Sequence, residues 1–315
     1  MTNRPLHLFL GVLALVLAAC APTGDPPLRT AAGADHEEGG IGGTGLGPDE
    51  EGGLGGTGVF GTVTGFGSVR LNGLRVELPD GVGTAGLAVG DTVALETVRE
   101  GEALVARRLA PVHPLVGPVE RVAADGLTVM GTPVTLGDGA VLDGTVRSGD
   151  WVAVSGIWRS GTVVATRVAP ATPGATAQVA GLLLGEGPRR TVGGTTVDLA
   201  CCGAAATGFA TVRGRYVGGV LVAEEASSQL FAPTVRWLVV EAFLARNPAD
   251  PGYHLSGFGI PMDPASPVPP TVGERSVFVG RLDGDFLIER SYPLPEDAAA
   301  RQRALEAIGA GALLE

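Results

Sequence analysis

Apolar and polar residues alternate over short stretches of the chain from residue 58 onward, with the period of two that is typical of β-strands. The clearest stretch is GDWVAVSGIWRSGTVVATRVAP, which begins at Gly149. Its two alternating runs meet at Gly161, where the chain can reverse in a tight turn. The pattern therefore predicts an antiparallel hairpin.

The hairpin pattern occurs four times along the chain. Successive copies start 59, 58 and 66 residues apart, at Gly90, Gly149, Thr207 and Gly273. Glycine stands at the predicted turn in the last three copies, at Gly161, Gly219 and Gly284. A recurrence of this kind indicates several copies of one small β unit.

A second element repeats upstream of each hairpin, at residues 61–78, 117–136 and 181–199. Each of these copies contains a two-residue turn between short strands, at Asn72-Gly73, Met130-Gly131 and Gly193-Gly194. The fourth copy, residues 253–263, is diverged and follows a long apolar strand at residues 236–246.

Each unit therefore has about five short strands in roughly 55–60 residues, which is typical of a small closed barrel of the OB type. We predict an all-β fold of tandem five-stranded OB-like barrels, with a β-sandwich built from pairs of units as the alternative. The predicted modules are residues 58–111, 112–171, 172–231 and a diverged 232–294.

The last segment, residues 295–315, predicts a short helix from about residue 296 to residue 308. Acidic residues lie at its start, and Gly309 could end it. Leu305 and Ile308 form an apolar edge that we expect to dock on the last barrel.

The first 19 residues have the features of a bacterial lipoprotein signal peptide. Arg4 precedes an apolar run from Leu8 to Ala19, which is too short to span a bilayer and has the length of a signal-peptide core. The run ends in LAAC, a lipobox, so we predict lipidation at Cys20. An ordinary secretory signal with a chance cysteine is the alternative. Ala21, in place of an aspartate, favours the outer membrane, facing the periplasm.

Residues 20–57 predict a flexible acidic tether behind the lipidated cysteine. They contain GGIGGTG and GGLGGTG at residues 39–45 and 52–58, and seven acidic residues against one arginine within residues 21–57. A phosphate-binding loop would need a Gly-Lys-Ser/Thr ending, and a calcium repeat would need regularly spaced aspartates. Neither is present in the sequence.

The composition restricts the core and the partners. Apolar residues make up 45% of the chain and aromatic residues 5%, so the core must consist of valine, leucine and alanine. The formal net charge is −11, and the sequence contains no lysine. Such an acidic chain repels phosphate backbones, so we expect no nucleic-acid partner. Attachment to a membrane must come from the lipid.

Catalytic and metal-binding patterns are not recognisable in the sequence, so we expect no enzymatic activity and no cofactor. The four histidines are expected to be isolated on the surface, at His7, His36, His113 and His254. Several aromatic residues could stack on a ligand, although a core role is the preferred interpretation: Phe66, Trp151, Trp158, Phe209, Tyr216 and Phe278.

The adjacent Cys201 and Cys202 are the unusual feature of the modules. In an oxidising compartment they could form a vicinal disulfide, or they could bind a soft metal such as Cu(I). The simpler interpretation is a pair of small buried residues in an alanine-rich loop.

The phrases GTVTGFGSVRLNG and GDWVAVSGIWRSGTVVATRV, with the preceding GGLGGTG, resemble a family of bacterial envelope proteins. Members of that family carry repeated small β domains of unknown function, often behind a lipobox and a glycine-rich tether. The resemblance covers residues 39 to about 170, fades in the third unit and is weak in the fourth. It implies an envelope location and supplies no catalytic residues.

Together these observations predict a lipid-anchored envelope protein of repeated β modules, with a non-enzymatic binding or scaffolding role in the periplasm. Its expected partners are the membrane, through the N-terminal lipid, and an unidentified periplasmic protein or glycan. A redox or metal-handling lipoprotein that uses Cys201 and Cys202 is the alternative.

Overall fold

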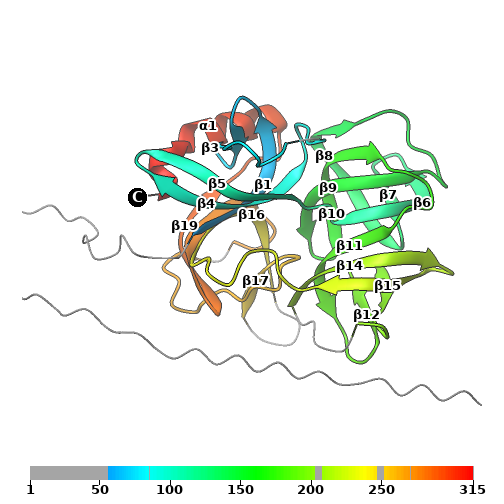
Figure 1. The fold of residues 1–315 in the computed structure, drawn as a ribbon. Helices are drawn as coiled ribbons and strands as arrows, with labels where there is room; N and C mark the ends of the chain where they lie inside the picture. The colour runs from blue at the N-terminus through cyan, green and yellow to red at the C-terminus, as the bar shows by residue number, and fades with distance from the viewer. Residues whose placement is uncertain (1–55, 85, 203–207, 247–251, 270, 315) are drawn as a thin grey trace, which may run out of the picture. The chain divides into compact units, whose positions relative to one another are not determined.

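The computed structural model describes residues 56–84, 86–202, 208–246, 252–269 and 271–314 (Figure 1). Residues 51–315 form one compact unit, and its described part is almost entirely β-structure with a single C-terminal helix. The predicted signal peptide, Cys20 and most of the tether lie outside the described residues.

The first barrel consists of five strands: β1 (Thr57–Gly65), β2 (Val69–Leu71), β3 (Leu74–Glu77), β4 (Thr92–Glu100) and β5 (Ala103–Pro111). The strands pair in the order β1-β2-β3-β5-β4, and β4 pairs with β1 to close the ring. Strands β3 and β5 run parallel, and the other neighbours run antiparallel. This is the strand order of an OB-type barrel.

The second barrel repeats this order with β6 (Leu115–Ala123), β7 (Gly126–Val129), β8 (Thr132–Leu142), β9 (Trp151–Arg159) and β10 (Thr162–Pro170), and the β6–β9 pairing closes it. The third barrel repeats it again with β11 (Ala177–Leu184), β12 (Arg189–Val192), β13 (Thr195–Asp198), β14 (Gly208–Val217) and β15 (Val220–Ser227).

The fourth unit has the same order in reduced form. Its strands are β16 (Trp237–Arg246), β17 (Tyr253–Leu255), β18 (Arg275–Asp283) and β19 (Asp285–Pro293). The place of the missing third strand is taken by two isolated bridges, His254 with Pro261 and Met262 with Phe286, of which the second is parallel. The prediction of tandem small barrels is therefore confirmed, and the closed rings rule out the sandwich alternative.

Each two-stranded hairpin is bent by a shift in register at an equivalent place, for example between Ala165 and Arg167. Three of these bends carry a glycine opposite a neighbouring backbone, at Gly156, Gly214 and Gly280, where an added Cβ would collide with a carbonyl oxygen. Bulges and glycines of this kind give a sheet the curvature that closes a narrow barrel.

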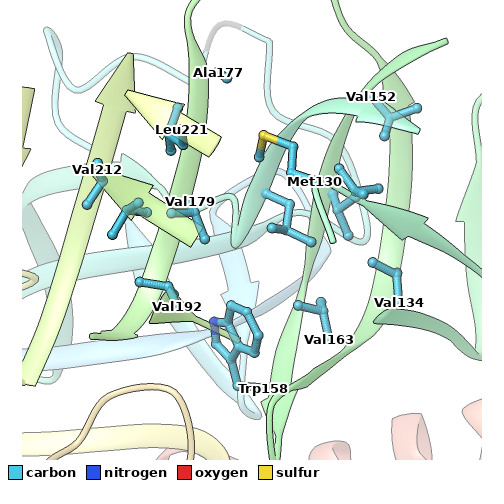
Figure 2. Packing of buried hydrophobic residues seen from close by; sticks show 14 of the residues in the cluster. Met130, Val134, Val152, Trp158, Val163, Ala177, Val179, Val192, Val212 and Leu221 are labelled. Carbon is cyan, nitrogen blue, oxygen red and sulfur yellow. The ribbon is translucent and has the colours of Figure 1, made fainter. Parts of the chain in front are cut away.

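The barrels are joined through their first strands. Strand β1 pairs in parallel with β16, and β6 pairs antiparallel with β11. In the second pair, equivalent residues meet: the Thr132 and Thr195 hydroxyls lie 2.8 Å apart, and Leu115 is opposite Val179. The second and third barrels thus form a pseudo-symmetric pair with one continuous apolar core, which Figure 2 shows around Met130 and Trp158.

Helix α1 (Ala298–Leu314) begins near the predicted position, and Gly309 interrupts it with non-helical backbone angles. Leu305 is buried in an apolar cluster that the first and fourth barrels share, and α1 lies beside β3 in Figure 1. The helix thus contacts the last barrel through this shared cluster, and it also packs on the first barrel, which was not expected. The turn at Gly73 leaves room for the Leu305 carbonyl, because Gly73 has no side chain.

Within the described part of the chain, α1 is too short and too polar to be a membrane-spanning segment.

Candidate functional sites

Two sites stand out in the described part of the chain. One is an open face of the first barrel around Phe66, which we call the Phe66 face. The other is a cavity of about 440 Å³ where the second, third and fourth barrels meet, which we call the junction cavity.

The Phe66 face lies over strands β2 and β3 and the loop that leads into them. It forms a hollow of about 410 Å³ lined by Phe66, Ser68, Val69, Arg75, Leu78 and Thr84, among others. Phe66 follows β1 in a turn and is 44% exposed, so its ring is accessible. The Ser68 hydroxyl accepts a hydrogen bond of 2.8 Å from Arg75 Nε and so holds the guanidinium beside the hollow.

The junction cavity is organised by Trp158, at the end of β9. The residue is 94% buried, and its Nε1 donates a hydrogen bond of 2.8 Å to the Ala180 carbonyl of the third barrel. Three glycines make space for the indole, because an added Cβ at any of them would collide with it: Gly181, Gly193 and Gly257. They belong to the third and fourth barrels, so Trp158 fixes three barrels together.

His254, on β17, lines the junction cavity and is 92% buried. Its Nδ1 atom is buried and has no hydrogen-bond partner among the described residues. Burial lowers the pKa of His254 below its ordinary value, so the imidazole is neutral at pH 7. A buried ring nitrogen without a partner costs about 1–3 kcal/mol unless a ligand atom or water pairs with it.

The remaining lining of the junction cavity is apolar with a few polar groups. Leu184 and Val272 are nearly half exposed at its rim. The Ser256 hydroxyl accepts a hydrogen bond of 3.1 Å from the Ser160 backbone amide and so connects the turn of the second barrel to the fourth. Arg246 supplies the positive charge, and its guanidinium carbon lies 5.4 Å from the centre of the Tyr253 ring.

Two further polar clusters join barrels to one another. Asp91 is almost fully buried and accepts hydrogen bonds from the Ala88 amide, the Ser155 hydroxyl and Arg167, at 2.8, 3.1 and 2.8 Å. Because Ser155 and Arg167 belong to the second barrel, this carboxylate ties the two barrels together. His113 lies in the same cluster, and its Nδ1 is 3.2 Å from the Ser155 hydroxyl.

The second cluster is a buried ion pair between Glu241 of β16 and Arg275 of β18, with an N–O distance of 2.7 Å. The other carboxylate oxygen of Glu241 accepts a hydrogen bond of 2.8 Å from the Thr62 amide of β1. Arg275 also donates to the Thr62 hydroxyl. This cluster therefore joins the first and fourth barrels.

Cys201 and Cys202 follow β13 and are joined as a disulfide between neighbouring residues. Cys201 is exposed, and Cys202 packs against the core of the second and third barrels. The described residues contain no group of three or more His, Cys, Asp or Glu side chains placed to hold a metal ion. Use of this pair in redox or metal chemistry stays a prediction.

The expectation of isolated surface histidines is wrong for His254, which is buried, and for His113, which is half-buried; burial lowers the pKa of His113 as well. His7 and His36 lie outside the described residues. Of the aromatic residues, Trp158 and Phe278 are buried as expected, whereas Phe66 is exposed.

The junction cavity was missed by the sequence analysis because its residues come from three units. Trp158, Arg246 and His254 are separated by up to 96 residues in sequence, and no spacing pattern connects them. Of the glycines that receive Trp158, only Gly193 was interpreted, as a turn residue, and Gly181 and Gly257 were given no role. A tryptophan in one unit that packs against glycines in other units leaves no recognisable pattern in a single sequence.

Residues 116–169 match the family model of a domain of unknown function, DUF5666. These residues are the five strands of the second barrel. The prediction of an uncharacterised small domain is therefore confirmed for this part of the chain. No curated protein matches the chain, and no solved structure matches it.

Proposed function

We propose that the protein is a lipid-anchored component of the bacterial cell envelope, attached through Cys20 and facing the periplasm from the outer membrane. The lipobox at residues 17–20 and the acidic, glycine-rich tether support this location. Three acyl chains on a processed cysteine would anchor the protein stably.

Replacing Cys20 with serine in the native cells tests the anchor. We expect the wild-type protein in the outer-membrane fraction and Cys20→Ser outside it, with labelled fatty acid incorporated only into the wild type. Equal membrane association of both proteins would contradict lipidation at Cys20.

The protein's role in the envelope is to bind a periplasmic protein or glycan without catalysing a reaction. The observation that carries this proposal is the Phe66 face, where an exposed aromatic ring lies beside an arginine held in place by Ser68. OB-type barrels bind oligosaccharides and oligonucleotides on the corresponding strands, which is an analogy of fold. The acidic chain disfavours nucleic acid, which leaves glycans and proteins.

Affinity purification of the tagged, anchored protein from its own cells tests the binding role. We expect a reproducible glycan or protein partner whose yield falls in Phe66→Ala and stays unchanged in Val217→Ala. Val217 is 60% exposed at the end of β14, away from the Phe66 face, and so serves as the matched control. A partner retained equally by both variants would refute the Phe66 face as its site.

A redox or metal-handling role for Cys201 and Cys202 is the second candidate, supported by their disulfide and by the exposure of Cys201. Thiol labelling of the purified protein tests it. Both thiols should become reactive after mild reduction of the folded protein. Thiols that react only in denaturant would end this candidate.

A further inference from the structure

The junction cavity has the properties of a site for a small molecule, independent of the Phe66 face. Its volume of about 440 Å³ lies within the range of about 300–1,000 Å³ that ligand pockets occupy. Its walls come from three barrels that Trp158 and the Ser160–Ser256 hydrogen bond hold in fixed positions. A cavity built by these contacts exists before any ligand enters.

The apolar part of the cavity runs from the rim to the indole. Leu184 and Val272 are 45% and 47% exposed, although both are large aliphatic side chains. Leu182 and Ala245 continue the same wall. A hydrocarbon chain placed here would cover the exposed aliphatic surface, which favours binding by about 25 cal/mol for each Å² removed from water.

The charge at the cavity has one sign. Among the described residues that line it, Arg246 carries the only full charge, and no described carboxylate pairs with it. Arg246 is exposed at the end of β16, and its guanidinium also makes a cation–π contact with Tyr253. Such an arginine fits a carboxylate, which it can bind through two parallel hydrogen bonds.

The buried residue His254 is a second polar group in the lining of the cavity. It lies on β17 opposite Ala245 of β16, and Arg246 is opposite Tyr253 in the same pair. The Nδ1 atom of His254 has no hydrogen-bond partner among the described residues. The cavity therefore offers a ligand an aliphatic wall and Arg246 as its charged group.

We propose that the junction cavity binds a small amphipathic carboxylate, with the aliphatic part against Leu184, Val272 and Trp158 and the carboxylate facing Arg246. The ligand class is defined by this combination: an unbranched or aromatic apolar body with one terminal negative charge. Neutral and cationic molecules with the same apolar body fit the walls and lack the partner for Arg246.

Calorimetric titration with three matched amphiphiles tests the proposal: octanoate, octanol and octyltrimethylammonium. The protein is the chain from residue 20 with Cys20→Ser, so that no acyl chain competes. The compact unit begins at Glu51, so this change leaves it whole. We expect one octanoate site per chain, octanol binding about tenfold weaker, and no binding of the cation.

Variants then locate the site. Arg246→Gln should weaken octanoate binding about tenfold, to the level of octanol, whereas Arg215→Gln, an exposed arginine on β14, should leave it unchanged. Leu184→Trp should block all binding by filling the rim, whereas Val217→Trp should not. Thermal unfolding of each variant, compared with the parent chain, shows that it is folded.

Equal binding of octanoate and octanol, or octanoate binding that Arg246→Gln does not weaken, would overturn the assignment of a carboxylate. Octanoate binding that survives Leu184→Trp would overturn the location. Absence of octanoate binding to the folded parent chain would overturn the proposal as a whole. None of these results bears on the partner of the Phe66 face, which is tested separately in cells.

Discussion

At the scale of single residues, the contact between Trp158 and Gly257 joins the second and fourth barrels. Gly257 has φ +81° and no side chain, and an added Cβ would collide with the indole. Gly284 has nearly the same backbone angle, φ +78°, and open space around it. An alanine at either position would suffer similar backbone strain, but only an alanine at Gly257 would also crowd Trp158.

We predict that Gly257→Ala destabilises the protein by about 1–3 kcal/mol more than Gly284→Ala, because only the first overpacks the junction. Denaturant unfolding measures both. In a Trp158→Leu background the two alanine variants should cost about the same. If Gly257→Ala still destabilised the protein more than Gly284→Ala in the Trp158→Leu background, the contact with the indole would be refuted as the cause.

The sequence predicted the turn glycines because a positive φ has a local signature. Asn72-Gly73 and Met130-Gly131 have the positive φ angles that a two-residue hairpin requires. It could not predict which glycines receive Trp158, because that requirement arises from packing between units. For the same reason, the burial of His254 could not be inferred from its neighbours in sequence.

At the scale of elements, hairpins and barrels follow from local patterns, whereas the pairing of barrels does not. Alternation and turn residues predicted the strands and the five-stranded unit. The pairings β1–β16 and β6–β11 join strands that are far apart in sequence. They form through backbone hydrogen bonds, which do not depend on the identity of the side chains. The contact of the helix with the first barrel was not predicted, because the apolar edge of Leu305 and Ile308 does not specify which surface it meets.

The buried Glu241–Arg275 pair is the polar contact that fixes the β1–β16 seam. We predict that Glu241→Gln destabilises the protein by about 3–5 kcal/mol, because it leaves a buried guanidinium without its counter-charge. Glu289→Gln, in the exposed pair with Arg281, should cost at most about 1 kcal/mol. Chemical unfolding of both variants checks the difference.

The double variant Glu241→Leu with Arg275→Met should recover much of that loss, since neither buried charge remains. If Glu241→Gln instead cost no more than Glu289→Gln, the pair would not be buried as described.

At the scale of the whole molecule, His113 and His254 make stability depend on pH. Burial is the main cause that lowers the pKa of both histidines. At His113, the negative charge of Asp91 opposes this shift and the positive charge of Arg167 adds to it. Arg246 is the charged residue that lines the cavity together with His254. Below the unfolded pKa of about 6.5 the unfolded chain binds more protons than the native state. Their contribution is therefore fully present above that pH and is lost as pH falls through the lowered values.

We predict that the melting temperature falls between pH 7.5 and pH 5, and that the fall is smaller in the double variant His113→Asn, His254→Asn. The comparison within one variant across pH cancels the direct cost of each substitution. An identical pH dependence in both proteins would mean that these histidines titrate normally.

The described residues thus form three closed barrels and a reduced fourth one, with the Phe66 face on the first barrel and the junction cavity among the other three. The central proposal for the function of the protein is that the Phe66 face binds an envelope partner. Lysine-directed cross-linkers are unsuitable because the chain has no lysine. A photoreactive phenylalanine analogue at a chosen position avoids this problem and reports contacts at one point.

The most direct measurement is photo-cross-linking in the native cells, with benzoylphenylalanine at position 66 or, as the control, at position 217. Our account predicts a discrete adduct from position 66 that is absent from position 217, and a protein or glycan as its second component. No adduct from position 66, or the same adducts from both positions, would contradict it.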